Sequence, residues 1–128
     1  MEEVGGVLIY CPSTKRVLLV KRSSEFDCPK TWALISGGIE ENETPLRSIK
    51  REILEELQYD PNKIFYRFIG IESNHNNFYF FQGLVEEEFT PILNHENEEY
   101  GWFDKDSLPS PLYPKLDDKI FEIWNITK

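Results

Sequence analysis

The chain has 128 residues, of which 40% are apolar and 14% aromatic, and its 23 acids outnumber its 14 bases to give a formal net charge of −9. This composition is typical of a folded domain with a hydrophobic core, and it excludes an intrinsically disordered chain. A strongly negative field repels a long phosphate backbone, so we do not expect DNA as a partner. A small phosphorylated ligand is still compatible, because a bound divalent cation inverts the local field.

The sequence predicts a single domain over residues 1–128, located in the cytoplasm and without membrane contact. No apolar run is long enough to cross a bilayer, and the start MEEVGG is acidic where a signal peptide would be basic. Cys11 and Cys28 are too few for a disulfide scaffold and lack CxxC spacing. We interpret them as reduced packing residues, with one disulfide left open as an alternative.

The first predicted elements in chain order are short strands. VLIY (7–10) and VLLV (17–20) are β-rich runs separated by CPSTKR, which predicts a hairpin. A third apolar run, WALIS (32–36), ends at the glycine pair Gly37-Gly38.

A helix is predicted next. Thr44 suits the N-cap and Pro45 suits the first helical position. Apolar residues recur at helical spacing and mark one buried stripe: Leu46, Ile49, Ile53 and Leu57. The helix should end near Gln58, because Asp60-Pro61 is a stop signal.

The second half of the chain predicts two longer strands, 64–72 and 77–87, joined by the turn SNHNN. A short strand (100–103) and a terminal helix (115–126) follow. Strands and helices are mixed without regular alternation, so the predicted fold class is α+β with a mixed sheet.

Three acids of the first helix, Glu52, Glu55 and Glu56, stand at positions i, i+3 and i+4 and share one side of it. Carboxylates so close together repel one another unless a cation neutralises them, and oxygen-rich clusters favour Mg²⁺ or Mn²⁺. A solvated helix face with an Arg51–Glu55 ion pair is the alternative interpretation.

The wider spacing favours the metal site. Five residues separate Gly37 from Glu43, and seven more separate Glu43 from the pair Arg51-Glu52. This pattern resembles the Nudix box, G-x5-E-x7-R-E-U-x-E-E-x-G-U with U a bulky apolar residue, at eight of its nine specified positions. Gln58 replaces the last glycine of the box. The flanking segments WALISGGIEENE and ENEEYGWF are also similar to Nudix sequences, so the resemblance covers nearly the whole chain.

The resemblance implies a Nudix-type α/β/α sandwich, with the mixed sheet between helices, and a Mg²⁺-dependent hydrolase, with Mn²⁺ as an alternative ion. Nudix enzymes cleave a nucleoside diphosphate linked to another group. Carried over by position, Glu52 and Glu56 would be the principal metal ligands, and Glu55 would bind directly or through water. The backbone carbonyl of Ser36 would complete the set.

The resemblance also implies catalytic and supporting roles. Arg51 would orient the glutamates, and Glu43 would brace the junction between loop and helix by pairing with Arg51. Gly37, followed by Gly38, would permit a tight turn that brings backbone close to metal and phosphate.

The acid that accepts a proton from the attacking water is not fixed by the box. Glu52 is one candidate. The resemblance implies Glu96 as a second, because some Nudix members carry a loop acid at the spacing by which Glu96 precedes Trp102, six residues, and Glu98 is the fallback. A solvated acidic loop is the alternative interpretation of residues 95–99.

Two departures from the family pattern concern backbone shape. Ser36 replaces a glycine and would be strained at positive φ. Gln58 would cost about 1 kcal/mol relative to glycine if the left-handed geometry of that position is kept.

Substrate class in this family is usually set outside the box, and we find no signature there. Lys21 and Arg22 are candidate phosphate contacts and Tyr79 a candidate for stacking on a base; ordinary surface charge and strand packing are the alternatives. We predict a small nucleotide substrate such as a canonical or modified (d)NTP. ADP-ribose or a nucleotide-sugar, a dinucleoside polyphosphate, and a non-catalytic nucleotide sensor are the alternatives. A homodimer is left open.

Overall fold

The computed structural model describes residues 2–25, 28–73, 76–114, 116, 118 and 120. They form a mixed β-sheet with α-helical structure, which confirms the predicted α+β class. The helix α1 spans Pro45–Leu57 and a short 3-10 helix spans Pro61–Lys63. The strands are β1 (Glu3–Cys11), β2 (Arg16–Arg22), β3 (Trp32–Ala33), β4 (Ile35–Gly38), β5 (Phe65–Ser73), β6 (Asn77–Leu84) and β7 (Asn97–Phe103).

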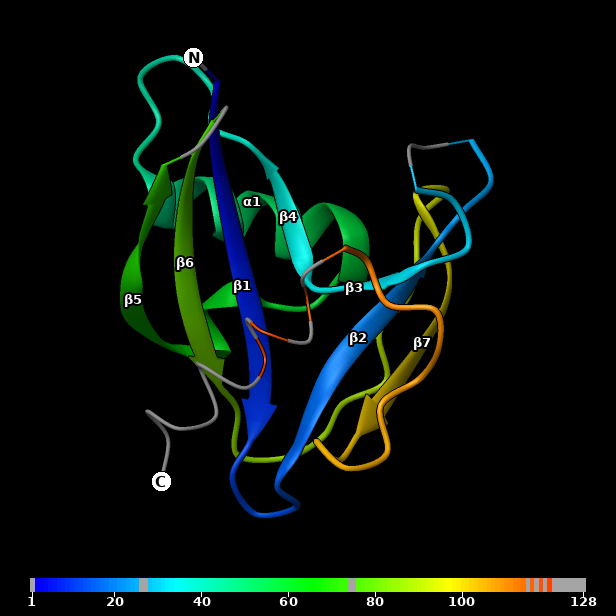
Figure 1. The fold of residues 1–128 in the computed structure, drawn as a ribbon. Helices are drawn as coiled ribbons and strands as arrows, with labels where there is room; N and C mark the ends of the chain where they lie inside the picture. The colour runs from blue at the N-terminus through cyan, green and yellow to red at the C-terminus, as the bar shows by residue number, and fades with distance from the viewer. Residues whose placement is uncertain are drawn as a thin grey trace.

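Strand β1 organises the sheet, whose main path runs β3-β2-β1-β6-β5 (Figure 1). On one side β1 pairs in parallel with β6. On the other side it has two antiparallel partners in turn: β4 pairs with residues 4–7 and β2 with residues 9–11. Strand β7 then pairs with β2. Because β1 changes partner along its length, β4 can lie under α1 while β2 leads away to β7.

The predicted hairpins 7–20 and 64–87 are present as antiparallel pairs. One strand prediction is wrong in detail, because WALIS splits at Leu34 into β3, which pairs with β2, and β4, which pairs with β1. The apolar run shows only that both segments are buried, whereas the split follows from their different partners. The terminal helix predicted for 115–126 falls largely on residues outside the described ranges, but Leu116, Asp118 and Ile120 are described, all three are helical, and Leu116 and Ile120 are buried.

Helix α1 begins and ends as its sequence predicts. The Thr44 hydroxyl accepts a hydrogen bond from the Arg47 amide at 3.1 Å, and Pro45 follows it. Its apolar stripe (Ile49, Ile53 and Leu57, with Leu46 at the edge) packs on β1, β2 and Phe81 of β6. No helix in the described part of the chain combines the length and apolar content needed to cross a membrane.

The opposite face of the sheet has its own core, formed by alternate residues of the same strands, such as Leu8, Tyr10 and Phe80, with Leu116 and Ile120. Residues 7–11 of β1 are therefore buried without alternation, as expected of a strand that is covered on both faces.

The two departures from the family pattern differ in outcome. Gln58 caps α1 in the left-handed region at φ 50°, as predicted, and its side-chain amide donates to the Ile92 carbonyl at 3.2 Å. Ser36 has no positive φ, because it lies in the extended strand β4, so the strain foreseen for it does not arise.

Replacing the N-cap should destabilise the fold. Thr44→Ala removes the acceptor for the Arg47 amide, and we expect it to lower the free energy of unfolding in urea by about 1 kcal/mol. Thr44→Ser keeps the hydroxyl and should retain most of the stability. Equal losses in the two variants would contradict the capping role.

Candidate active site

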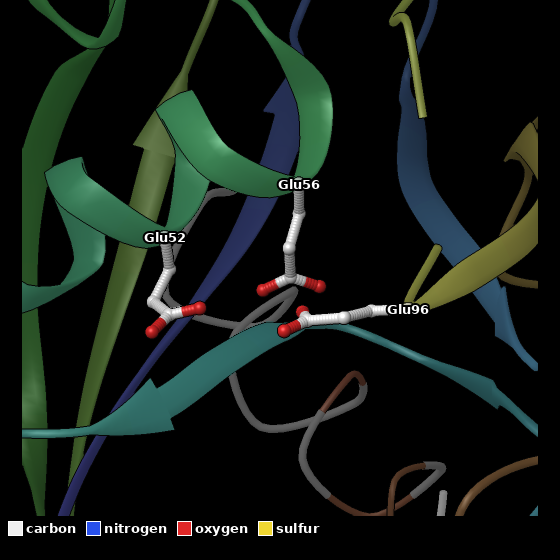
Figure 2. Close-up of side chains that lie close together, drawn as sticks. All are labelled: Glu52, Glu56 and Glu96. Atoms are coloured by element: carbon white, nitrogen blue, oxygen red, sulfur yellow. The ribbon is translucent and has the colours of Figure 1, made fainter. Parts of the chain in front are cut away.

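Three glutamates converge between α1 and the start of β7. Glu52 and Glu56 point from α1 toward Glu96, which approaches from the segment before β7 (Figure 2). One carboxylate oxygen from each lies within 4.8 Å of the others. Glu52 and Glu56 are buried, and Glu96 is half-buried. The alternative interpretation, a solvated helix face, is therefore wrong for Glu52 and Glu56.

The position of Glu96 depends on the pairing of distant segments. Its carbonyl accepts a hydrogen bond from the Ser23 amide at 2.9 Å, just beyond β2. Its own amide donates to the side-chain oxygen of Asn94 at 3.0 Å. The β2–β7 ladder shifts register between Lys21 and Arg22, immediately before this contact. These bonds hold the loop so that the Glu96 side chain reaches α1.

Glu56 is held by one oxygen only. Asn97 is 5% exposed, and its amide nitrogen donates to Glu56 Oε1 at 2.8 Å. The second oxygen, Oε2, is buried, and no hydrogen-bond donor reaches it from the described residues. A buried carboxylate oxygen without a partner is costly, so this atom fits a ligand position for a cation.

The raised pKa values of two of these glutamates favour the binding of a cation at the group. Burial raises the pKa of Glu52. Burial also raises the pKa of Glu56 strongly, with the neighbouring Glu52 carboxyl and then the charge of Glu96 adding to the effect. The Asn97 hydrogen bond opposes the shift of Glu56, and Arg51 opposes that of Glu52.

Arg51 joins the helix to the preceding loop. Its guanidinium donates to Glu43 at 2.8 and 3.0 Å, to Glu52 at 2.8 Å and to the Gly38 carbonyl at 2.9 Å. The predicted Glu43–Arg51 pair is thus present, and it holds the pKa of Glu43 at about 2. Glu55 is 3.6 Å from the same guanidinium. One arginine shared among several acids cannot neutralise the converging group.

The tight turn predicted at Gly37 was wrong, whereas the predicted approach of its backbone to metal and phosphate stays a prediction. It was expected to serve a tight turn, yet it lies in β4, and no glycine in the described residues has positive φ. A Cβ at this position would instead clash with the carboxylate of Glu52. Glycine is needed here because the Glu52 carboxylate lies directly against the backbone.

Glu55 and Glu98 lie outside the converging group. Glu55 is exposed, Glu98 forms an ion pair with Lys30 at 2.6 Å, and Ser36 lies opposite Gly6 in the β1–β4 ladder. The roles of Glu55 as a ligand and of Ser36 as a carbonyl donor stay predictions.

The three predicted substrate contacts each have a different partner. Lys21 lies 3.4 Å from Glu99, the Arg22 guanidinium lies over the Tyr113 ring at 5.4 Å, and the Tyr79 hydroxyl donates to Glu3 at 2.8 Å. Nothing in these contacts tests whether they bind substrate.

Asn97 is the residue that sequence reasoning missed. The segment ENEE was considered only for its acids, and an asparagine beside them carries no pattern of its own. Its donation to Glu56 depends on the packing of β7 beside α1, which sequence spacing does not specify.

The residues present fit a divalent metal of the Mg²⁺ type. Three carboxylates supply the hard oxygen donors that this ion prefers, and Oε2 of Glu56 is buried without a hydrogen-bond donor among the described residues. Glu52 and Glu56 are the residues that would hold it, and the carboxylate of Glu96 lies beside them.

The chain is thus an α+β protein with a mixed sheet and a capped helix packed against it. It carries a carboxylate-rich candidate metal site. Comparison with known proteins gives its family: a model described as the NUDIX domain matches residues 2–122. The chain therefore belongs to the Nudix hydrolase family, as the box predicted.

Relatives and solved structures agree. The chain is 31% identical over 114 residues to a dihydroneopterin triphosphate diphosphatase of Haemophilus influenzae, covering 75% of this chain and 70% of the relative. It is 34% identical over 92 residues to an RNA pyrophosphohydrolase of Helicobacter pylori, covering 67% of this chain but only 57% of that protein. Its fold is similar to a Nudix hydrolase from M. smegmatis, RenU, with a TM-score of 0.84, 20% identity, and coverage of 98% and 84% of the two chains.

Neutralising Glu56 should stabilise the metal-free protein. Because its pKa is raised in the folded state, its stabilising contribution is complete below the unfolded value near 4.5 and is lost as pH rises through the folded value. We expect metal-free Glu56→Gln to melt about 3–5 °C above wild type at neutral pH, with the difference shrinking toward acidic pH. The exposed Glu41→Gln serves as control, and a lower melting temperature for Glu56→Gln at neutral pH would contradict the expectation.

Proposed function

We propose that this chain is a Mg²⁺-dependent pyrophosphohydrolase that acts on a small triphosphorylated substrate, and that residues 1–128 form one catalytic domain. The observation that supports it most directly is the convergence of Glu52, Glu56 and Glu96 within 4.8 Å beside the Nudix box helix. Mn²⁺ is the alternative ion. A cytoplasmic location stays a prediction from the sequence.

Each residue of the group has a separate task in this proposal. Glu52 and Glu56 hold the metal, with Glu55 and the Ser36 carbonyl contributing from its edge. When bound, the ion lowers the pKa of a water molecule and withdraws charge from phosphorus. Arg51 fixes the orientation of Glu52 through its 2.8 Å bond.

Glu96 is the proposed general base. Glu52 already accepts from Arg51, and Glu98 is paired with Lys30, whereas the Glu96 carboxylate is half-buried within the group. Among the described residues no hydrogen-bond donor is recorded for the Glu96 carboxylate, and a carboxylate without a fixed donor is better able to take the proton of the attacking water.

The substrate proposal combines the relatives with the charge of the chain. One relative is named for dihydroneopterin triphosphate, and the other is named for RNA. A net charge of −9 opposes a long polyanion. We therefore favour a single nucleotide or pterin triphosphate, from which pyrophosphate would be released, over RNA. Lys21, Arg22 and Tyr79 remain the proposed substrate contacts.

A panel of substrates tests the proposal. Wild type with Mg²⁺ or Mn²⁺ should release pyrophosphate or phosphate from at least one of these: canonical and oxidised (d)NTPs, dihydroneopterin triphosphate, 5′-triphosphorylated RNA, ADP-ribose or a dinucleoside polyphosphate. Glu56→Gln should lower turnover of the best substrate at least about a hundredfold, because a metal ligand is lost, while Glu41→Gln should not. Metal binding without any turnover would favour the nucleotide sensor instead.

The base assignment has its own comparison. Glu96→Gln should lower kcat while Mn²⁺ affinity changes little, whereas Glu52→Gln should weaken Mn²⁺ binding as well. Isothermal titration with Mn²⁺ and steady-state kinetics on both variants supply the measurement. A Glu96→Gln enzyme with wild-type kcat would remove Glu96 from the mechanism.

Asn97 should matter through Glu56. Asn97→Leu keeps the approximate size but removes the donor, so Glu56 Oε1 is released and Mn²⁺ affinity should fall by about 10–100-fold. The exposed Asn62→Leu is the matched control. An Asn97→Leu protein that is less stable but binds Mn²⁺ as wild type does would show that Asn97 only supports the fold.

A further inference from the structure

Strand β5 forms an open edge of the sheet. It ends the path β3-β2-β1-β6-β5, and within the described residues its ladder partner is β6 on one side only. Figure 1 shows it at the border of the molecule, beside β6. The backbone groups on its outer side therefore offer a row of donors and acceptors to another strand.

The side chains of this edge are unusually apolar for an exposed position. Phe68 is 52% exposed and Ile71 is 54% exposed, and Phe65 at the start of the strand is 66% exposed. Scattered exposed apolar residues are normal, but Phe68 and Ile71 lie on the same face of one edge strand and mark a surface that gains from being covered.

A glycine lies in the middle of the same strand. Gly70 has no positive φ, so the backbone conformation does not require glycine. A Cβ at this position would meet no atom within 4 Å, so internal packing does not require it either. Gly70 borders the irregularity in the β5–β6 ladder, and a glycine in a strand often marks such a bulge.

We propose that β5 pairs with β5 of a second copy of the chain, antiparallel, about a two-fold axis between Ile69 and Gly70. In this register Arg67 of one copy stands opposite Glu72 of the other, and Phe68 stands opposite Ile71. Each contact occurs twice by symmetry, as an isologous interface requires.

The faces of the strand agree with this register. Arg67 and Glu72 are paired with Gln82 and Phe78 of β6 and so share one face of the sheet. Phe68 and Ile71, paired with Phe81 and Tyr79 of β6, share the face that carries α1. A shift by one residue would place Phe68 opposite Glu72 and separate the two opposite charges. The charge pattern thus selects a second copy of this chain as the occupant.

The interface should be weak. The β5–β6 ladder has an irregularity between Phe68 and Gly70, which twists the strand locally and restricts pairing to a few residues on each side. Interfaces this small are typical of transient association. None of the three converging glutamates lies on β5, so the pairing is independent of the proposed hydrolysis and of its test.

Sedimentation equilibrium of the full chain from about 5 to 300 µM tests the proposal. Wild type should show a reversible monomer–dimer equilibrium, and Phe68→Lys should raise the dissociation constant at least about tenfold, because it places a charge against Ile71 of the other copy. Leu54→Lys is the matched control, since Leu54 is 56% exposed on α1 and away from β5. A monomeric wild type over this range, or equal weakening by Leu54→Lys, overturns the proposal.

Charge reversal tests the register independently of packing. Arg67→Glu and Glu72→Arg should each weaken the dimer, because each places like charges opposite one another. The double variant Arg67→Glu/Glu72→Arg should restore association to near the wild-type constant. Circular dichroism and melting temperature confirm that each variant is folded. A folded double variant that stays as weak as the single variants overturns the proposed pairing.

Discussion

The repulsion among Glu52, Glu56 and Glu96 is the constraint on which the rest of the site depends. Their oxygens lie within 4.8 Å of one another, and burial raises the pKa of Glu52 and of Glu56, so their ionised forms are unfavourable unless a cation joins them. The surrounding residues hold this unfavourable arrangement in place: Arg51 ties Glu52 to the loop, and Asn97 fixes one oxygen of Glu56. The folding free energy thus offsets the repulsion between the acids, and a bound divalent metal would relieve that repulsion.

The split pairing of β1 lets the site draw on both halves of the sheet. Its first half pairs with β4, which brings Gly37 against the Glu52 carboxylate, and its second half pairs with β2, which leads to β7 and Glu96. Burial on both faces makes β1 a rigid axis for these contacts. A small shift between the halves would separate Glu96 from α1, so the Ser23–Glu96 and Asn97–Glu56 hydrogen bonds matter more than their individual energies suggest.

The net charge of −9 and the open edge of the sheet affect which ligands and which protein partners the molecule can bind. The negative field favours a small ligand that arrives with a cation over a long polyanion. It also opposes association of two copies, so any pairing must rely on local contacts. On β5 these are apolar side chains and a single pair of opposite charges, Arg67 and Glu72, whose spacing is self-complementary.

The sequence by itself determined the fold class, the limits of α1 and the identity of its acids, because these depend on local spacing: Thr44 and Pro45 start the helix, and Glu52 and Glu56 share a face with period 3.6. It also predicted the Glu43–Arg51 pair through the resemblance. Only the tertiary structure decided that Glu96 joins the group while Glu55 and Glu98 do not, that WALIS splits, and that Asn97 donates to Glu56. The reason is physical: these outcomes depend on which distant strands pair and in which register, and no local pattern carries that information.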